Sequence, residues 1–573
     1  MKPLQPSFII RACLFIHHRQ PAQPAGPARS LPLSPPTRLK HRLALAALLM
    51  LTAANLTLAP SASAAPAGGT GTGSLPALGD NSELSAAAER RIGDRIATSI
   101  YRDPDYLDDP VLSDYLQSIW QPLLAAARSR GELGAEIDER FAWQLFLVRD
   151  RSVNAFALPG GYFGVHLGLI ATVGSVDELA AVLGHELSHV TQRHISRLMT
   201  QQNRQAPWMI AAMILGVLAA GKNPSAGSAA IVGGQAVAAQ SQLNFSRDME
   251  READRVGFGV MTDAGFAGRG VTSMFEKLQQ ANRLNDNGAY PYLRSHPLTT
   301  ERIAEAQARQ QLAPGNKPAK EALAEAGKAR VLHTMMTARA RILAAPGVDA
   351  LHAMVAEARQ RVSALPAPSA VESPAAAATP TNSRDAGALY GGVLAAAQLR
   401  DFAGARSLLA RLKPLTAPLD RAASAVELLG IELDLLAGVT PPSAPSFDMA
   451  SAGARDQVLT QARALLAAQR AADVSGRLQS WVAGHPKDAM AWQLLAVAYG
   501  SQNQPVRAIR ADAESRAAQL DYTGALDRFK AAQGLMRSNP GSADYVEGSI
   551  IDTRTRQIES LVKEQALQDK IDR

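Results

Sequence analysis

The most informative segment of the chain is DELAAVLGHELSHVTQRHISRL, residues 177–198. Apolar side chains recur in it with helical spacing, and Ser175 or Asp177 can cap its first turn, so we expect one amphipathic helix here. His185 and His189 are four positions apart within its HELSH motif, and residues at this spacing share one face of a helix. Both imidazoles can therefore reach a single Zn²⁺ ion.

Glu186 follows the first histidine of this motif and lies about 100° further around the helix, where it can contact a water molecule beside the metal. Its carboxylate can take a proton from that water during peptide hydrolysis and pass it to the leaving nitrogen. The alternative is a surface helix with two solvated histidines. Apolar neighbours favour a buried helix instead: Ala180, Ala181, Val182, Leu183, Leu187 and Val190.

A catalytic zinc needs a third protein ligand, and the downstream sequence SRDMEREAD at 246–254 offers one. Positions Gln192 and Ile195 exclude the extended motif HExxHxxGxxH, which would supply a third histidine. Glu250 and Asp254 are i,i+4 neighbours, so one can bind zinc while the other holds a ligating histidine or a backbone group. The alternative is that Glu250 belongs to a solvated charged face.

Two nearby polar residues are not assigned to the site, although a role there stays an alternative for His194. His194 lies five residues past His189, on a different face of the expected helix, and its predicted role is structural or an interaction with the C-terminal end of the helix dipole. Glu252 is predicted to point away from the face that carries Glu250 and Asp254.

Composition favours a large, mainly helical protein. The chain has 573 residues, of which 47% are hydrophobic, 19% charged and only 5% aromatic, and Ala-rich runs are frequent. The clearest β region is expected between 141 and 170, where short apolar runs flank a Pro-Gly-Gly turn. The net charge is +7, but residues 1–64 contain seven basic residues and no acidic one. The remainder is neutral, which removes the electrostatic basis for nucleic-acid binding.

Residues 1–64 are predicted to be an N-terminal extension with a signal peptide. Basic residues at 38–42, an apolar run at 43–58 and Ala-Ser-Ala at 62–64 follow the order of a secretory signal. An uncleaved membrane anchor is the alternative. Cys13 is the only cysteine and lies before the cleavage point, so the exported chain is expected to have no disulfide, thiol nucleophile or cysteine-bound zinc.

The stretch 206–239 consists almost wholly of small and apolar residues, interrupted by Lys222, Asn223 and Pro224. Two membrane spans are conceivable, but each arm has only about 14 residues, where a spanning helix needs about 20. We therefore expect a buried or flap-like helical hairpin, with membrane contact as an open alternative.

Four motifs together resemble one peptidase family. They are HELSHVTQRH from His185, the glutamate of SRDMEREAD 61 residues after His189, NAFALPG at 154–160 and SHPL at 295–298. In these motifs the chain is similar to the gluzincin peptidases, which include the CAAX prenyl protease and HtpX. The resemblance is strong over 85–310 and weaker over 385–540. It implies a zincin-like metallopeptidase domain that binds one Zn²⁺ ion per chain.

The resemblance also implies roles for individual residues. The E-x-x-x-D pair puts the third metal ligand on Glu250 and places Asp254 behind the ligands. The family's His-Pro and Arg fall on His296 and Arg302, where the histidine lies near the metal and the arginine helps to order the catalytic site. His296 can latch the enzyme by filling the open fourth metal position, or it can stabilise the oxyanion during catalysis. An ordinary loop histidine is the third alternative.

The expected fold is mainly α: a zincin-like metallopeptidase domain with a small β-sheet, followed by a tetratricopeptide-like α-solenoid. The solenoid is suggested by Trp492-x2-Leu495-Ala496-x2-Tyr499, Ala525-x3-Phe529 and Pro540, and a plain helical bundle is the alternative. The expected parts after the signal are a tether at 65–80, the peptidase domain at 81–345, a flexible linker at 363–385 and the repeats at 386–545.

The resemblance implies an exported zinc metalloendopeptidase of the periplasm that cleaves unfolded or misassembled envelope proteins, in outer-membrane protein quality control and β-barrel assembly. The implied partners are unfolded outer-membrane or periplasmic proteins and, through the repeats, the β-barrel assembly machinery. An extended substrate can add to the expected strand at 155–158 as an extra strand. The rival function is that of a periplasmic chaperone or scaffold that acts through its repeats while the zinc site is mostly latched.

Overall fold

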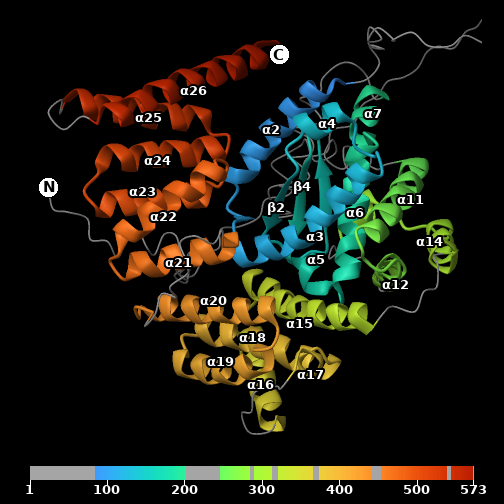
Figure 1. Ribbon diagram of the computed structural model, residues 1–573. Coiled ribbons are helices and arrows are strands. Elements are labelled where there is room, and N and C mark those ends of the chain that lie inside the picture. Colours follow the sequence, from blue (N-terminus) through green and yellow to red (C-terminus); the bar gives the residue numbers. More distant parts are fainter. Residues whose placement is uncertain are drawn as a thin grey trace, which may run out of the picture. The chain divides into compact units, whose positions relative to one another are not determined.

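The computed structural model describes residues 84–201, 246–283, 290–312, 320–365, 373–441, 453–538 and 544–571. The expected signal peptide, the tether, the apolar stretch 206–239 and Pro540 lie outside these residues. The described part consists of many helices around one small sheet (Figure 1), which confirms the predicted fold class. None of the described helices is both long enough and apolar enough to cross a membrane.

A four-stranded sheet lies in the N-terminal part of the chain. Its strands are arranged in the order β1 (Tyr106–Leu107), β2 (Gln144–Val148), β4 (Tyr162–His166) and β3 (Ala155–Leu158). β2 and β4 are parallel, whereas β1 and β3 pair antiparallel with their neighbours. Gly160 and Gly161 both have positive φ, 73° and 79°, in the predicted turn between β3 and β4. The strand at 155–158 is therefore an edge strand of the described sheet.

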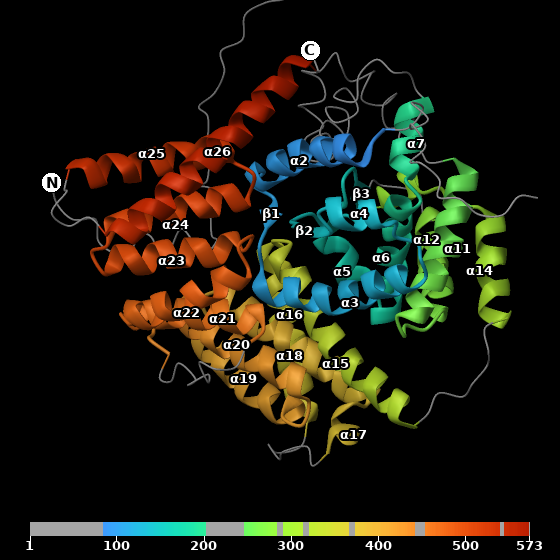
Figure 2. The same cartoon turned by 45° about the horizontal axis from the view of Figure 1, so that its top comes forward.

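Alternating side chains of the sheet are buried on opposite faces. Phe146 and Tyr162 pack against the apolar side of α2 (Ala86–Arg102), while Phe163 packs on the other face against α3 (Pro110–Ser129). Figure 2 shows the strands between these two helices. The sheet is thus covered on both faces, and its strand β3 contacts α6, the helix that carries the HELSH motif.

The prediction of one continuous helix over 177–198 was wrong. Helix α6 (Val176–Thr191) ends early, and a second helix, α7 (His194–Gln201), begins three residues later. Arg193 between them has a left-handed backbone with φ of 56°, which a helix cannot contain. Its guanidinium donates a hydrogen bond to the buried Glu89 carboxylate, 3.0 Å away, so a contact distant in sequence supports the break.

The remaining helices fall into two groups. In the N-terminal part they are α4 (Ala135–Arg140), α5 (Leu167–Thr172), α11 (Arg247–Asp263), α12 (Arg269–Arg283), α13 (Tyr292–Ser295), α14 (Thr300–Leu312) and α15 (Lys320–Leu343). They are followed by α16 (Val348–Ala364), α17 (Pro374–Ala377), α18 (Pro380–Gln398), α19 (Phe402–Thr416), α20 (Asp420–Ala437), α21 (Arg455–Ala467), α22 (Ala471–Gly484), α23 (Ala489–Ser501), α24 (Pro505–Ala518), α25 (Tyr522–Ser538) and α26 (Tyr545–Ile571).

From α18 onward each helix packs against the next along the chain, an arrangement consistent with an α-solenoid. The aromatic residues that suggested repeats lie inside it: Trp492 and Tyr499 are buried between α22, α23 and α24, and Phe529 is buried in the following helices. Assignment of these helix pairs to the tetratricopeptide class remains a prediction.

The hydrophobic core does not divide at the expected linker, 363–385. α16 extends to Ala364 and α18 begins at Pro380, because alanine favours helix and a proline is well tolerated in the first turn. Leu389 and Tyr390 of α18 are fully buried in the same apolar cluster as the residues of α15 and of the N-terminal part. Independent folding of the parts on either side is therefore not expected.

A buried ion network also crosses this boundary. Arg339 of α15 donates hydrogen bonds of 2.8 and 2.7 Å to Asp109, which caps α3, and two of 2.8 and 2.7 Å to Glu432 of α20. The Tyr390 hydroxyl lies 3.2 Å from the same guanidinium. Because the Arg339 charge is buried, it depends on partners from both sides of the expected linker.

A carboxyl pair between α3 and α21 leads to a pH-dependent prediction. Burial and the negative charge of Asp114 raise the pKa of Asp456 from 3.8 to about 6. Between these two values the folded chain binds a proton that the unfolded chain has lost, so this contribution to stability is lost as the pH rises through 6. We expect Asp456→Asn to raise the melting temperature more at pH 8 than at pH 5, because at pH 5 only part of this contribution has been lost. Equal shifts at the two pH values would contradict the assignment.

Candidate metal centre

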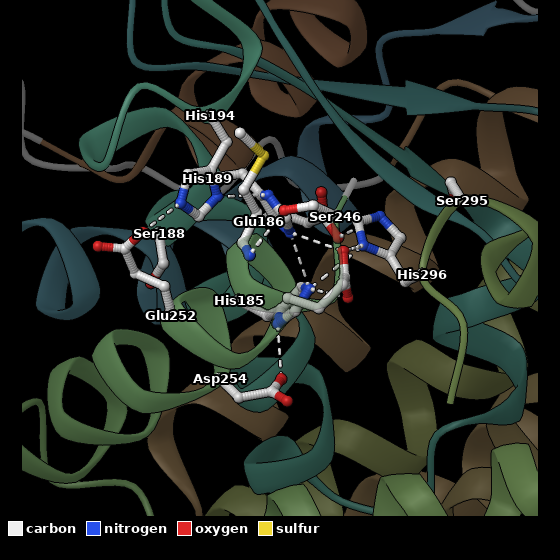
Figure 3. A network of polar contacts seen from close by, with 12 residues as sticks. His185, Glu186, Ser188, His189, His194, Ser246, Glu252, Asp254, Ser295 and His296 are labelled. Atoms are coloured by element: carbon white, nitrogen blue, oxygen red, sulfur yellow. Dashed lines mark hydrogen bonds and ion pairs between the residues drawn. The ribbon is translucent and has the colours of Figure 1, made fainter. Parts of the chain in front are cut away.

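Four buried side chains converge on one point in the N-terminal part. They are His185, His189, Glu250 and His296, and one ligand atom from each lies within 4.8 Å of all the others. The Nε2 atoms of His185 and His189 are 3.0 Å apart, and Glu250 carboxylate oxygens lie 3.5 Å from each. Figure 3 shows the imidazoles pointing toward one another.

Two helices hold three of these donors against each other. Ser175 caps α6 and Ser246 caps α11, each through a side-chain oxygen that accepts a backbone N–H. The helices approach closely where Gly184 faces Gly257, because a Cβ atom on Gly257 would lie 3.0 Å from the Gly184 backbone. This contact brings Glu250, one turn into α11, level with the HELSH motif.

His296 reaches the cluster from the short helix α13. Its backbone N–H donates to Tyr292 O at 2.9 Å, and its ring stacks on the buried Tyr292 ring with centroids 4.6 Å apart. His296 Nδ1 then lies 3.0 Å from Glu250 Oε1 and 3.2 Å from His185 Nε2. The structure therefore places His296 among the metal donors and not on the surface of a loop.

Asp254 and Arg302 lie behind the donors. Asp254 Oδ1 is 3.0 Å from His185 Nδ1, the nitrogen on the far side of the ring from the cluster. Arg302 of α14 donates two hydrogen bonds to Asp254, 2.6 and 2.9 Å long, and its Nη1 lies 2.8 Å from Glu250 Oε2. Arg302 thus orders both acidic residues, and it also donates a hydrogen bond of 2.8 Å to Pro297 O.

The charge pattern of the cluster fits a metal cation. Burial lowers the pKa of His185, but the adjacent Asp254 and Glu250 carboxylates outweigh it and raise this pKa to about 10. Burial opposes ionisation of Glu250, yet the neighbouring His296 and His185 hold its pKa well below the ordinary value. The site therefore favours positive charge between its nitrogen and carboxylate donors. Imidazole and carboxylate donors are the usual ligands of one zinc ion.

Glu186 lies beside the cluster without a strong partner. Its side chain is 1% exposed, and in the described part of the chain neither carboxylate oxygen accepts a hydrogen bond of good geometry. His296 Nε2 is 3.4 Å from Oε1. Burial raises the pKa of Glu186, opposed by the positive charge of the nearby histidines. A buried carboxylate that accepts no hydrogen bond of good geometry is suited to accept a proton.

The structure also brings in residues that sequence reasoning had left out of the site. His194 and Glu252 lie behind His189, and Tyr292 supports His296. On a continuous helix, a side chain five positions after His189 is turned by roughly 140° relative to it. For this reason His194 was not assigned to the site. The spacing of four residues between Tyr292 and His296 was the one available signal for the tyrosine.

Comparisons with known proteins agree with this geometry. Residues 113–310 match Peptidase family M48. The β-barrel assembly-enhancing protease of Escherichia coli strain K12 is 32% identical over 247 residues, which cover 43% of this chain and 49% of that protein. A Vibrio cholerae protein provisionally given the same name is 36% identical over 237 residues, 41% of this chain and 47% of the relative. Mitochondrial metalloendopeptidase OMA1 of Arabidopsis thaliana is 29% identical over 195 residues, 34% and 36% of the two chains.

The chain spans about half the length of the β-barrel assembly-enhancing proteases that it matches. The segment matched by the family contains all four donors of the candidate metal centre. The predicted resemblance to these metallopeptidases is therefore confirmed, and it coincides with the buried zinc-type cluster. Over residues 113–310 the chain is thus similar to Peptidase family M48.

Proposed function

We propose that the chain is a zinc-dependent metalloendopeptidase. The observation that carries this proposal is the buried group of metal donors on α6, on α11 and at the end of α13, next to the buried carboxylate of Glu186. The names of the relatives, a protease and a metalloendopeptidase, support the same reaction. His185, His189 and Glu250 would hold the ion, with Asp254 and Arg302 keeping His185 and Glu250 in place.

The proposed chemistry divides between the ion and Glu186. A bound zinc ion polarises a peptide carbonyl and lowers the pKa of water, which is the activation that peptide hydrolysis needs. Glu186 takes the proton of the attacking water and delivers it to the departing amide nitrogen. Its burial supports this role, because a carboxylate with a raised pKa holds the proton between the two steps.

Strand β3 is the proposed guide for the substrate. It is an edge strand of the described sheet, and it contacts α6, the helix that carries the HELSH motif. An extended polypeptide can pair with such an edge through its main chain and so be read with little sequence preference. Unfolded proteins, which present extended segments, are therefore the proposed substrate class.

We place this activity outside the cytoplasm, in the periplasm, because of the signal-like segment at 1–64. The relatives named for β-barrel assembly support outer-membrane or periplasmic proteins as substrates, with the assembly machinery as a further proposed partner of the helices after α18.

Metal removal tests the proposed function. Dialysis of the full chain against a zinc chelator is expected to abolish cleavage of a denatured test protein, and one equivalent of Zn²⁺ should restore it, because the donors form one site. Thermal unfolding before and after dialysis checks that the apo chain stays folded. Cleavage that persists in the apo chain, or that zinc fails to restore, would refute the proposal.

We further propose that His296 latches the site by acting as a fourth protein donor. Its position 3.0 Å from Glu250 and 3.2 Å from His185 supports this role, as does its stacking on Tyr292. The same closure supports the rival function, a chaperone or scaffold with a mostly latched site. If no substrate and no variant gives measurable proteolysis, that result would favour the rival function.

His296→Ala is expected to raise basal cleavage of a denatured protein severalfold, since the fourth position then stays accessible. A lower kcat in this variant would instead identify His296 as an oxyanion donor. The control is His352→Ala, which changes an exposed histidine of α16 and is expected to leave the rate unchanged. Initial rates of all three proteins at one zinc concentration decide between these outcomes.

A further inference from the structure

We propose that His194 is a positioning residue that orients the metal ligand His189 and fixes its tautomer, and that Glu252 holds His194 in the form this requires. The inference rests on the proposed zinc site but not on the proposed peptidase reaction. It assigns a role to two residues on α7 and α11 that sequence reasoning had not assigned to the site.

Two hydrogen-bond contacts connect His189 to Glu252 through His194. His189 Nδ1 lies 2.9 Å from His194 Nδ1, and His194 Nε2 lies 3.0 Å from Glu252 Oε2. Arg197 donates a hydrogen bond of 3.0 Å to the same carboxylate oxygen. Figure 3 shows His194 between His189 and Glu252, on the side of His189 away from His185.

Once His189 binds a metal ion, only one direction of hydrogen-bond donation is consistent with the contacts from His189 through His194 to Glu252. His189 Nε2 faces the other metal donors and must be unprotonated to bind a metal ion, so Nδ1 carries the hydrogen. His194 Nδ1 must then accept that hydrogen bond, which leaves the hydrogen of His194 on Nε2. That N–H donates to Glu252, whose ionised carboxylate can only accept. A His194 with hydrogens on both nitrogens would set two donors against each other.

The backbone is bent to make this contact. On an unbroken helix the side chain at 194 would be turned by roughly 140° from His189. The left-handed conformation of Arg193 ends α6 and returns His194 onto the ring of His189, where it is 0% exposed. The same left-handed conformation follows other helices of the chain, at Arg400 after α18 and at Gln469 after α21.

The expected consequence is tighter metal binding. A partner on the second ring nitrogen prevents the imidazole from rotating and makes its ligating nitrogen more basic. His185 has its own partner in Asp254, at 3.0 Å. Each histidine of the HELSH motif is therefore supported from behind, one directly by a carboxylate and one by a carboxylate acting through a second histidine.

The test compares three substitutions of His194 in the full chain by Zn²⁺ competition with a chromophoric chelator. His194→Phe should lower zinc affinity by roughly 10–100-fold, the usual loss when such a partner is removed. His194→Asn places an acceptor near the position of Nδ1 and should stay within a few-fold of the wild type. His194→Gln reaches toward Glu252 but offers no acceptor to His189, and should resemble His194→Phe.

The control is His333→Phe, which removes a buried histidine bonded on both nitrogens, to Tyr115 at 2.6 Å and to Val173 O at 3.1 Å, away from the donors. It should lower the melting temperature without changing zinc affinity. Equal zinc affinity in the Asn and Gln variants would overturn the proposal, whether or not His194→Phe folds. Zinc affinity is measured without substrate, so a wild-type chain that fails to cleave proteins would refute the proposed function and leave this comparison intact.

Discussion

Glu186→Gln is expected to lower kcat for cleavage of a denatured protein by about 10²–10⁴-fold while the chain keeps its zinc ion, because glutamine can neither accept nor deliver the proton. The substitution keeps the size of the side chain, which is buried beside His296 and is not one of the four metal donors. Zinc content by atomic emission and rates of cleavage are measured on the same sample. This variant therefore separates proton transfer from metal binding.

Two reference variants make that result decisive. His185→Ala removes a metal donor and should lose both zinc and activity. Glu136→Gln makes the same chemical change at an exposed position of α4 and should alter neither. The role assigned to Glu186 is wrong if its variant cleaves at the wild-type rate, or if it loses zinc to the same extent as His185→Ala.

A chain that ends at Ala364 is expected to lose cooperative folding. The cut would remove α18 and α20, and with them Leu389 and Tyr390, which are buried in the core shared with the peptidase part. Arg339 would also lose Glu432 and keep only Asp109. Breaking a buried ion pair alone costs about 3–5 kcal/mol, a large part of the roughly 5–15 kcal/mol that stabilises a typical domain.

The control for this truncation is a chain that ends at Pro441. It keeps the whole of the apolar cluster that includes α15, α18 and α20, and it loses the helices from α21 on, whose interiors form separate clusters. We expect this chain to unfold cooperatively and to bind zinc, as judged by calorimetry and by metal content. A cooperative, zinc-binding chain that ends at Ala364 would show instead that the two parts fold independently.

The helix of the HELSH motif could be predicted from local spacing. Residues four apart on a helix are neighbours whatever surrounds them, so His185 and His189 were expected to meet, and their Nε2 atoms are 3.0 Å apart. The Pro-Gly-Gly turn was equally local, because two consecutive positive φ values favour glycine. Selection of Glu250 over Asp254 needed the family resemblance, since both residues lie on one helical face.

The linker at 363–385 shows where composition misleads. Its alanines and prolines are typical of a flexible segment, but alanine is also the strongest helix former and proline suits a first helical turn. The described residues at its ends are helical because Leu389 and Tyr390 further along α18 are buried against α15. The burial of α18 against residues distant in sequence therefore outweighed the linker-like composition of 363–385.

Sequence alone was enough for the features that depend on neighbours within a few residues: the helical character, the paired histidines, Glu186 beside them and the short β region. Tertiary contacts decided the features that join distant residues. Gly257 lets α11 approach α6 closely enough for Glu250 to reach the histidines, and Tyr292 holds His296 over them. The left-handed Arg193 brings His194 back to His189. Local spacing cannot predict these contacts, because the partners are remote in the sequence: Glu89 for Arg193 and Glu252 for His194.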